Sequence, residues 1–462
     1  MLAWGTPGRP VAKSLPGSSK RAGTKPAESA LRARESLSLR LSHVSSRLKE
    51  RKMVRTAVIL ASDDKGMAPV FGIPAARRLA LHLVRIGFTH IHMVGRVNSF
   101  VPVLSDLVPE RCFHPVMNGE SLERVVRELG IPAEERVLVL KANLVADRSA
   151  LARFLASCGE ATACRMEVAG ARGRNDGLYL ADQANLVSIV DSLWSNSDLD
   201  PAVLKDIKEI PALGGLPSII EDRETDAGKS EDRLVKALGA QTEADDGLMA
   251  RYFDRHISQF VSRRLAHTGI MPNHITLIGM TLGLIGALLL SLQGYWVKVV
   301  GSFLFVVCVI VDGVDGEVAR LKMKESTFGH YLDIVTDNIV HAAIFVGIAF
   351  GLYHDTGDAG YLGYLWVLLG GFCVCLVAVY VFILRLDADT LSRSPKTLRI
   401  MALVTNRDFA YLVFALAVIG RLSWFLLGAA LGSYAFAIVL CFVGSRERRT
   451  RAAAIKHPAS SQ

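Results

Sequence analysis

The chain has 462 residues, of which 51% are hydrophobic, and its mean hydropathy of +0.32 is high for a soluble protein, so we expect membrane-embedded segments. The net charge of +9 is confined to residues 1–52, which hold twelve Lys/Arg and three Asp/Glu, whereas the rest of the chain carries 41 basic and 41 acidic residues. Net charge therefore gives no support for a nucleic-acid partner of the folded part.

Residues 1–52 are rich in Ser, Arg, Pro and Ala, contain few aromatic residues and lack a continuous apolar run. This composition predicts a disordered basic tail, and the missing apolar core argues against a secretory signal. An organellar transit peptide or a contact with anionic lipid would also suit the composition. We favour a misassigned start, with translation beginning at Met53, directly before the strand-type run Arg55–Ala61.

Residues 53–220 alternate short β-type runs with amphipathic helical segments. A helix is predicted at 75–87. Strands are predicted at 56–61, 90–94 and 136–140. Such alternation is typical of an α/β domain with a mainly parallel sheet. The charged segment 221–247 that follows is predicted to be a linker or a solvated helix.

Long apolar runs dominate residues 248–445. An amphipathic basic segment at 250–267 comes first and suits a helix at the membrane surface or one that packs on the α/β domain. Six membrane spans are predicted at 274–292, 297–317, 330–352, 361–384, 409–421 and 423–443. The fold class is therefore multi-domain: a soluble α/β domain, then an all-α six-helix transmembrane domain, with a basic cytoplasmic tail at 446–462.

The placement of Lys and Arg predicts the orientation of these spans, because cytoplasmic loops carry an excess of both. The basic segments that would share the cytoplasmic side are Arg263–Arg264, Arg320–Lys324, Arg385–Arg407 and Arg446–Arg451. Lys298 and Arg421 are exceptions on the opposite side. We therefore expect an integral, multi-pass membrane protein whose soluble domain faces the cytoplasm.

Four carboxylates stand near the ends of the second and third apolar runs, where a charge is costly and is usually retained for function. They are Asp312, Asp315, Asp333 and Asp337. Spacings of three and four residues place the members of each pair on one helix face. Two converging carboxylate pairs suit one or two hard divalent cations such as Mg²⁺.

The stretch from Asp312 to Asp337 matches every fixed position of the pattern D-x2-D-G-x2-A-R-x8-G-x3-D-x3-D. Its other fixed positions are Gly316, Ala319, Arg320 and Gly329. In this it resembles the CDP-alcohol phosphotransferase family. An incidental acidic cluster in a loop between membrane helices is the alternative, and eight specified residues argue against it.

This resemblance implies an enzyme that uses Mg²⁺ (or Mn²⁺), with two ions expected, in phospholipid or polar-lipid biosynthesis. A substituted phosphate would pass from a CDP-linked donor, either CDP-diacylglycerol or a CDP-polyol, to an alcohol acceptor, with release of CMP. Its expected partners are therefore the donor, the acceptor and membrane lipid, and a homodimer is also compatible.

The resemblance also implies roles for single residues. The first three aspartates would be metal ligands, and Asp337 would be a ligand or the base, which we favour over Asp333 as base. The nucleotide-binding positions would be Gly316, Ala319, Arg320 and Gly329. Arg320 could pair with a phosphate or extend to the membrane interface.

Further polar residues near the motif have weaker assignments. Pro272–Thr276 is interpreted as a helix start, capped by Asn273 or Thr276. His330 and His341 flank the second carboxylate pair and are given structural roles, because Mg²⁺ sites favour oxygen ligands. Acceptor or phosphate binding is assigned to Arg385, Arg399 and Arg407, although charges that set topology would explain these arginines almost as well.

The 53–220 region resembles sugar-phosphate nucleotidyltransferases, which have a Gly-rich, Arg-containing loop after the first strand. Here the corresponding loop, Ser62–Met67, is short and acidic, and Lys141–Asn143 stands where that family usually has a metal-binding Asp. We therefore predict that the fold persists without cytidylyl transfer. The domain order resembles bifunctional inositol-phosphate cytidylyltransferase / di-inositol-phosphate-phosphate synthases. A bifunctional enzyme and a catalytically silent membrane scaffold are the two alternatives.

Overall fold

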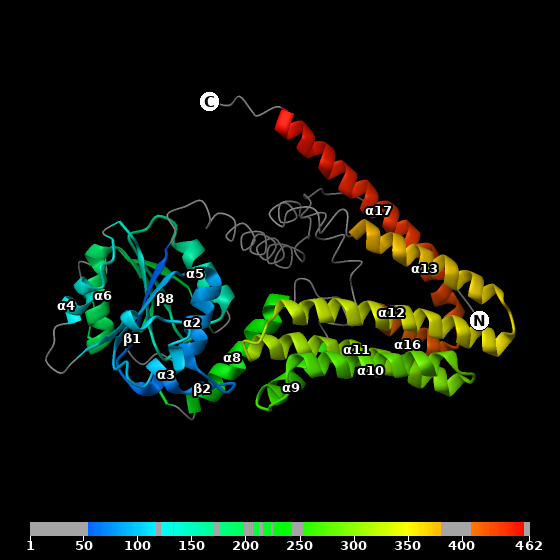
Figure 1. Cartoon of the computed structure of the whole chain (residues 1–462), viewed down its shortest axis with the longest axis horizontal. Coiled ribbons are helices and arrows are strands. Elements are labelled where there is room, and N and C mark those ends of the chain that lie inside the picture. Colours follow the sequence, from blue (N-terminus) through cyan, green and yellow to red (C-terminus); the bar gives the residue numbers. More distant parts are fainter. Residues whose placement is uncertain are drawn as a thin grey trace, which may run out of the picture.

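The computed structural model describes residues 54–456 apart from 117–121, 133, 170–175, 198, 200–202, 204, 206, 212–215, 223–224, 243–252 and 380–407. An α/β domain lies at one end of an elongated helical domain (Figure 1). This confirms the predicted order of an α/β domain followed by a helical one. The predicted N-terminal tail at 1–52 lies outside the described residues. The three arginines to which acceptor or phosphate binding is assigned, Arg385, Arg399 and Arg407, also lie outside them.

A seven-stranded sheet forms the centre of the α/β domain, in the order β10-β8-β9-β6-β1-β4-β5. Its strands are β1 (Thr56–Ala61), β4 (His90–Gly95), β5 (Phe113–Pro115), β6 (Val137–Lys141), β8 (Ala163–Glu167), β9 (Gly177–Ala181) and β10 (Ile207–Ile210). Only β9 pairs antiparallel with its neighbours in this sheet. This pairing confirms the prediction of a mainly parallel sheet. Buried strands joined by helices favour parallel pairing.

Helices cover both faces of this sheet. One face packs on α2 (Ala75–Ile86), α3 (Val101–Leu104) and α5 (Arg148–Cys158), and the other on α4 (Leu122–Glu128) and α6 (Gln183–Ser195). Alternate residues of β1 divide between the two cores: Ile59 joins the first and Val58 the second. This alternation is the period of two that a strand imposes.

Short elements complete the domain. They are the helical turns Asp64–Met67 and Glu110–Cys112, the hairpin β2 (Pro69–Val70) and β3 (Ile73–Pro74), and the pair β7 (Leu144–Val145) and β11 (Ser218–Ile219). The charged segment 221–247 contains helix α8 (Thr225–Thr242). Leu234 and Val235 of α8 are buried, so one face of this charged helix packs like a core element.

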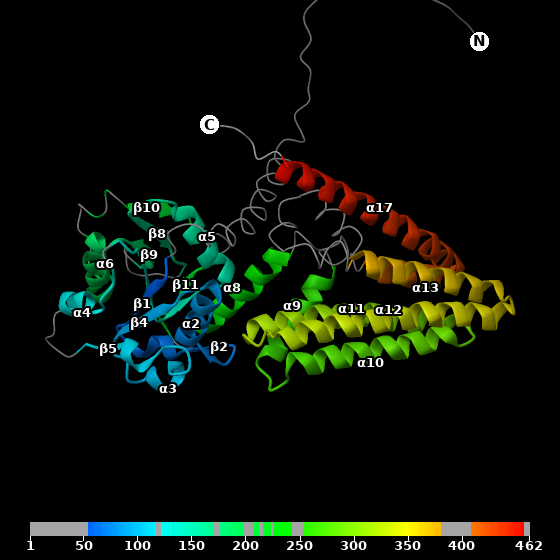
Figure 2. The ribbon, with the colours of Figure 1, turned by 45° about the horizontal axis from the view of Figure 1, so that its top comes forward.

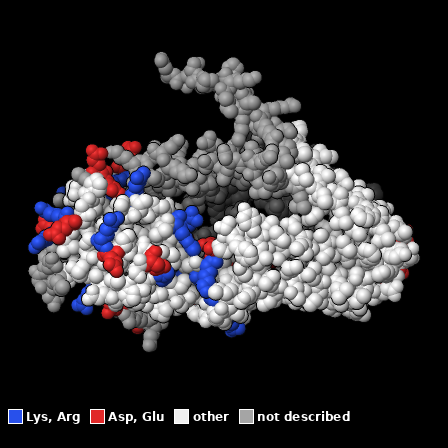
Figure 3. Space-filling model, viewed as in Figure 1, with Lys and Arg blue, Asp and Glu red and all other residues white. Residues whose placement is uncertain are grey.

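Four described helices are long and apolar enough to cross a membrane. They are α10 (Pro272–Ser291), α11 (Tyr295–Leu321), α12 (Thr327–Thr356) and the Leu422–Val439 part of α17 (Leu422–Lys456). Shorter apolar helices lie in α13 (Gly360–Val379) and α16 (Phe409–Ile419). Figure 3 shows an almost uncharged surface over the helical domain, as expected where lipid is the solvent. The count of six spans stays a prediction.

Close packing joins α10, α11 and α12, which lie side by side in both ribbon views (Figures 1 and 2). A methyl group at Gly347 or Gly351 of α12 would overlap the backbone of α10. One at Gly286 of α10 would lie 2.8 Å from the carbonyl oxygen of Gly301 in α11. Small residues allow such close approach of membrane helices, and the three-helix unit is therefore held in one register.

Lys298, an exception to the predicted charge asymmetry, is buried inside this unit. Its Nζ donates to the Gly351 carbonyl at 2.8 Å and also to the Asp355 carboxylate. A buried charge is tolerated when it is paired and hydrogen-bonded. Lys298 thus links α11 to α12 at the end away from the α/β domain, which explains why it departs from the pattern.

Helix α9 (Arg255–Ala266) is the amphipathic segment that precedes the spans. Its Ser258 and Ser262 are buried against α11, while Phe260 is 57% exposed and Phe253, just before the helix, 53%. The main contact of α9 is therefore with α11, and the exposed aromatic side chains suit a membrane interface. Ala266 at its end joins the core cluster that it shares with the α/β domain.

Candidate metal and phosphate site

Three of the predicted carboxylates converge where α11 and α12 face each other. Asp312, Asp315 and Asp333 each offer an oxygen, and these three atoms lie within 4.8 Å of one another. Asp312 and Asp315 stand one turn apart on α11, and Asp333 stands in the second turn of α12. Residues far apart in the sequence thus form one cluster because the two helices are antiparallel neighbours.

The donor set of this cluster fits a hard divalent cation. It contains carboxylate oxygens alone, which Mg²⁺ prefers. Asp333 Oδ1 is buried and has no hydrogen-bond partner among the described residues. A buried oxygen of this kind needs compensation, and like charges brought this close repel each other unless a cation lies between them. These carboxylates therefore have the arrangement of a metal site.

Asp337 lies one helical turn beyond Asp333 on α12. It interacts electrostatically with Asp333 and with Asp315, but it is not one of the three carboxylates whose oxygens converge. This position, beside the converging set and outside it, is compatible with either predicted role, ligand or base.

Thr276 of α10 extends the cluster to a third helix. Its hydroxyl is buried and donates to Asp315 Oδ2. The prediction of a helix start at Pro272 is confirmed, because Pro272 is the first residue of α10. The prediction that Asn273 or Thr276 caps this helix is wrong: Met271 is the N-cap, and no side chain caps it. The Thr276 hydroxyl, one turn inside the helix, instead orients a carboxylate of the site.

Replacing Thr276 by Val should weaken metal binding without unfolding the bundle, because the change is nearly isosteric and removes one hydrogen-bond donor. We expect the Mg²⁺ concentration that gives half-maximal activity to rise about tenfold, as for other groups that orient a metal ligand. Thr281→Val is the matched control, since the exposed Thr281 hydroxyl donates to Leu277 O within its own helix. An unchanged Mg²⁺ dependence in Thr276→Val would contradict this role.

Arg320 and Gly316 form the predicted phosphate-binding part of the site. A Cβ at Gly316 would lie 3.8 Å from the two terminal guanidinium nitrogens of Arg320, so the two positions are neighbours on α11. Arg320 Nε is buried and has no hydrogen-bond partner among the described residues. A guanidinium with an unpaired Nε donor next to a carboxylate cluster suits a phosphate group.

Gly329 and Ala319 have structural explanations as well. A Cβ at Gly329 would lie 3.1 Å from Ser326 Oγ, which caps α12, and 3.2 Å from Asn273 Oδ1. Gly329 therefore allows the start of α12 to pack on the start of α10. The Ala319 carbonyl accepts a hydrogen bond from the Lys324 amide at 2.8 Å and so belongs to the end of α11.

Glu317, a variable position of the motif, is a buried anchor that sequence reasoning missed. Its carboxylate accepts from Arg255 Nη1 at 2.8 Å, Ser258 Oγ at 2.9 Å and Ser262 Oγ at 2.7 Å. Because Glu317 lies two residues after Asp315, it points to a different side of α11. The available signals were a carboxylate inside an apolar helix and serines four residues apart on one face of the preceding amphipathic segment.

The two histidines near the second carboxylate pair do not share a role. His341 packs against Phe305 and Phe409, with ring centroids at 6.1 and 5.1 Å, so its surroundings are those of a structural residue. His330 is exposed at the start of α12. Neither belongs to the converging ligand set.

The loop Ser62–Met67, which is predicted to have lost phosphate binding, makes contacts with other parts of the α/β domain. Lys65, its basic residue, pairs with Glu221 at 3.1 Å. A Cβ at Gly66 would lie 2.7 Å from Ala142 O, so the loop packs directly on the segment after β6. Lys141, the last residue of β6, pairs with Asp176, and Asn143 in the segment after it donates to Ile220 O at 2.8 Å.

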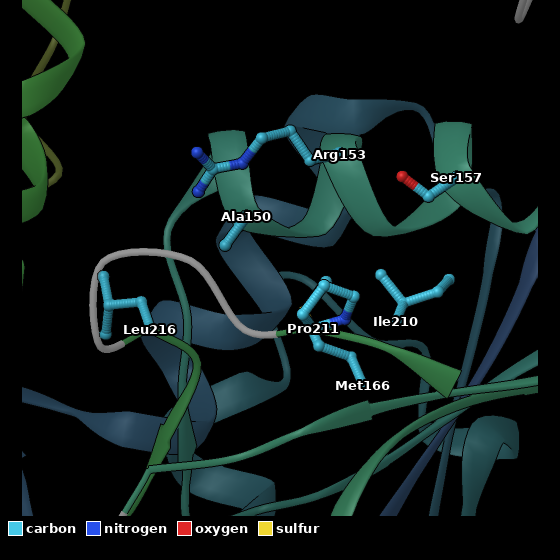
Figure 4. Close-up of a pocket in the computed structure, with 7 residues that line it drawn as sticks. All are labelled: Ala150, Arg153, Ser157, Met166, Ile210, Pro211 and Leu216. Atoms are coloured by element: carbon cyan, nitrogen blue, oxygen red, sulfur yellow. The ribbon is translucent and has the colours of Figure 1, made fainter. Parts of the chain in front are cut away.

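A small cavity in the α/β domain offers no alternative site. It encloses about 120 Å³ between α5 and the strands below it (Figure 4). Its lining residues are Ala150, Arg153, Ser157, Met166, Ile210, Pro211 and Leu216. Ligand pockets usually measure about 300–1,000 Å³, and this one is mainly apolar, so it does not fit a nucleotide.

The fold thus combines an α/β domain with helices long and apolar enough to span a membrane, and two of these antiparallel helices hold a cluster of carboxylates that could bind a cation. In the C-terminal part of the chain, residues 269–444 match the model of the CDP-alcohol phosphatidyltransferase family. All eight fixed motif positions lie within the matched residues.

Curated relatives extend the similarity beyond that domain. A bifunctional IPC transferase and DIPP synthase of Aquifex aeolicus is 26% identical over 261 residues, which cover 56% of this chain and 56% of the relative. A phosphatidylinositol phosphate synthase of Mycolicibacterium smegmatis is 35% identical over 111 residues, 23% of this chain and 48% of the relative. The chain thus matches about half the length of these relatives.

Among solved structures, the phosphatidylinositol phosphate synthase of Mycobacterium tuberculosis with CDP-DAG bound is 20% identical. The match covers 42% of this chain and 93% of that one, with a TM-score of 0.25.

Proposed function

We propose that the helical domain transfers a substituted phosphate group from a CDP-linked donor to an alcohol hydroxyl and releases CMP. The observation that carries this proposal is the convergence of Asp312 and Asp315 with Asp333 inside a CDP-alcohol phosphatidyltransferase domain. A metal-type carboxylate cluster in a domain of this family supports catalysis rather than the scaffold alternative.

The reaction exchanges one phosphorus–oxygen bond for another. The acceptor oxygen bonds to the phosphorus of the donor, and the bond to the CMP oxygen breaks. Asp337, beside the cluster, would take the proton that the acceptor hydroxyl loses. Arg320 would hold a phosphate of the donor through its guanidinium group, and Gly316 would leave room for the nucleotide beside α11.

Divalent cations, Mg²⁺ or Mn²⁺ and two in number, would neutralise the charge that develops on the pyrophosphate during transfer. Asp312, Asp315 and Asp333 would hold them, and Asp337 would be a further ligand where it does not act as the base. In such transfers the protein mainly positions the reactants and stabilises charge. The site lies at the end of the bundle that carries the α/β domain, and we assign this end to the cytoplasm, where a water-soluble nucleotide is available.

The names of the relatives make inositol-containing acceptors the first choice, with CDP-diacylglycerol or a CDP-polyol as donor. The test is to incubate the purified protein with each donor, Mg²⁺ and a panel of alcohols that includes inositol phosphates. Release of CMP together with a product mass equal to the acceptor plus the transferred group would support the proposal. Failure of every pair to release CMP, by a protein whose thermal stability responds to Mg²⁺, would contradict it.

The α/β domain, we further propose, does not make the CDP-linked donor, in contrast to the bifunctional alternative that the relatives' names suggest. The support is local: Lys65 and Lys141 are committed to ion pairs, and the loop has no unoccupied basic residue to hold a triphosphate. The acidic Asp63 and Asp64 would repel one.

Full-length protein carrying Asp333→Asn should therefore release no pyrophosphate from CTP and a polyol phosphate above background. This variant leaves the α/β domain unchanged and disables only the proposed transfer site. Pyrophosphate release that falls when Lys141 is replaced by Ala would instead assign cytidylyl transfer to the α/β domain and favour the bifunctional enzyme.

A further inference from the structure

The end of α11 has an unusual cap, formed by residues 319–325 and called here the α11 cap. The Lys324 amide bonds to Ala319 O at 2.8 Å and the Met323 amide to Arg320 O at 3.2 Å. This pair of hydrogen bonds defines the Schellman cap, whose left-handed position is usually glycine. Here that position is Met323, with φ +55°, a conformation that disfavours residues with a side chain.

Arginines of the α/β domain bind the carbonyls that this cap leaves exposed. Arg78 of α2, which is 2% exposed, donates to Leu321 O at 2.5 Å and to Val70 O at 3.0 Å. Arg85, two turns further along α2, donates to Met323 O at 2.9 Å and pairs with Glu325 at 2.6 Å. The last carbonyls of a helix lack partners within the helix, and cations there also interact favourably with its dipole.

The Arg78 guanidinium keeps its charge in this position. Burial lowers its pKa to about 10, which still leaves it protonated near neutral pH. The surrounding packing is tight as well, because Leu321 shares a core cluster with Val70 and Phe71 of the hairpin that follows β1 and with residues of α8. The contact between the two domains thus includes buried core residues of both. Figures 1 and 2 both show α8 between the two domains.

We propose that Arg78 and Arg85 are positioning residues, and that the α/β domain acts through them as a clamp on the α11 cap. For its kinetic effect this inference rests on the proposed function of the helical domain. Leu321 directly follows Arg320 and lies six residues after Asp315, so the clamped turn is continuous with the turns that carry the phosphate and metal groups. Fraying or rotation of this end would displace Arg320 first.

In this way the α/β domain would contribute to the reaction of the helical domain even without cytidylyl transfer activity of its own. Met323 at the left-handed position makes the cap weak on its own, because glycine would adopt this conformation without strain. The cap therefore depends on Arg85, which holds the Met323 carbonyl, and on Arg78, which holds the Leu321 carbonyl.

The test is the rescue of one substitution by another in the full-length protein. Arg85→Ala should lower kcat about tenfold with little change in the KM for the donor, since small misplacements of catalytic groups cost large factors in rate. Adding Met323→Gly should restore kcat to within about threefold of the unmodified protein, because the cap then forms without the clamp. Met323→Asn, which also tolerates this conformation, should restore it partly. Arg78→Lys, which keeps the charge, should retain more activity than Arg78→Ala.

Arg77→Ala is the matched control. Arg77 precedes Arg78 on α2, but its guanidinium binds Val103 O and Asp106 within the α/β domain. It should therefore leave kcat unchanged. A normal kcat in both Arg85→Ala and Arg78→Ala, or a failure of Met323→Gly to improve Arg85→Ala, would overturn the clamp.

Hydrogen exchange separates this inference from the proposed function. The amides of residues 320–325 should exchange faster in Arg85→Ala and regain protection with Met323→Gly, whether or not any donor is turned over. If the unmodified protein releases no CMP, the proposed function fails, and the exchange rates still decide whether the clamp exists. Equal exchange in all variants would overturn it.

Discussion

Asp312→Asn and Asp333→Asn are each expected to abolish CMP release, with losses on the order of 10³-fold or more, as for residues that act as one catalytic unit. Each change removes one charge from a set whose oxygens lie within 4.8 Å of one another. The remaining carboxylates would no longer match the charge of the bound cations. The measurement is CMP release from the donor that the unmodified protein uses.

Folding should survive these changes, because Asn has the shape of Asp and removing a like charge reduces repulsion within the cluster. Mg²⁺ or Mn²⁺ should raise the melting temperature of the unmodified protein by binding only its folded state, and this increase should be lost in both variants. Asp358→Asn provides the control, since Asp358 is exposed in the loop after α12. Near-normal turnover in Asp312→Asn or Asp333→Asn would refute the metal site.

Glu317→Ala is expected to cause the largest loss of stability among single substitutions near the site, about 3–5 kcal/mol, because it leaves buried and partly buried polar partners without their shared acceptor. Those partners are Arg255, Ser258 and Ser262 of α9. The melting temperature in detergent should fall by on the order of 10 °C. Because Glu317 lies between Asp315 and Arg320, activity should fall as well.

Two comparisons test whether this network, rather than charge in general, is responsible. Arg255→Ala removes one partner and should destabilise the protein, whereas Arg264→Ala should have little effect, since Arg264 lies over the exposed Phe260 ring at 4.0 Å. Glu317→Gln keeps an acceptor and should fall between Glu317→Ala and the unmodified protein. Equal melting temperatures for Glu317→Ala and Arg264→Ala would show that α9 is not anchored through Glu317.

Much of the fold followed from local patterns in the sequence. The predicted strands at 56–61, 90–94 and 136–140 correspond to β1, β4 and β6, and the predicted helix at 75–87 corresponds to α2. These predictions succeeded because hydrophobic periodicity and run length depend on neighbouring residues only. The carboxylate pairs were found for the same reason: spacings of three and four residues define one helix face wherever the helix lies.

The tertiary structure decided the contacts between distant segments, which no local period encodes. The sequence offered Thr276 as a cap, yet the packing of α10 on α11 turns its hydroxyl toward Asp315. In the motif, Glu317 is only a variable position. The packing of α9 on α11 places two serines and an arginine around its carboxylate.

The junction between the domains shows the same limit most clearly. Arg78 and Leu321 are 243 positions apart, and their hydrogen bond exists only because the β2–β3 hairpin, α8 and the end of α11 pack into one core. The sequence by itself predicted the strands β1, β4 and β6, the helix α2, the apolar helices and the carboxylates that could hold a cation. Only the packing of these elements decided which polar groups share a buried space, because burial makes an unpaired group costly and so selects its partners.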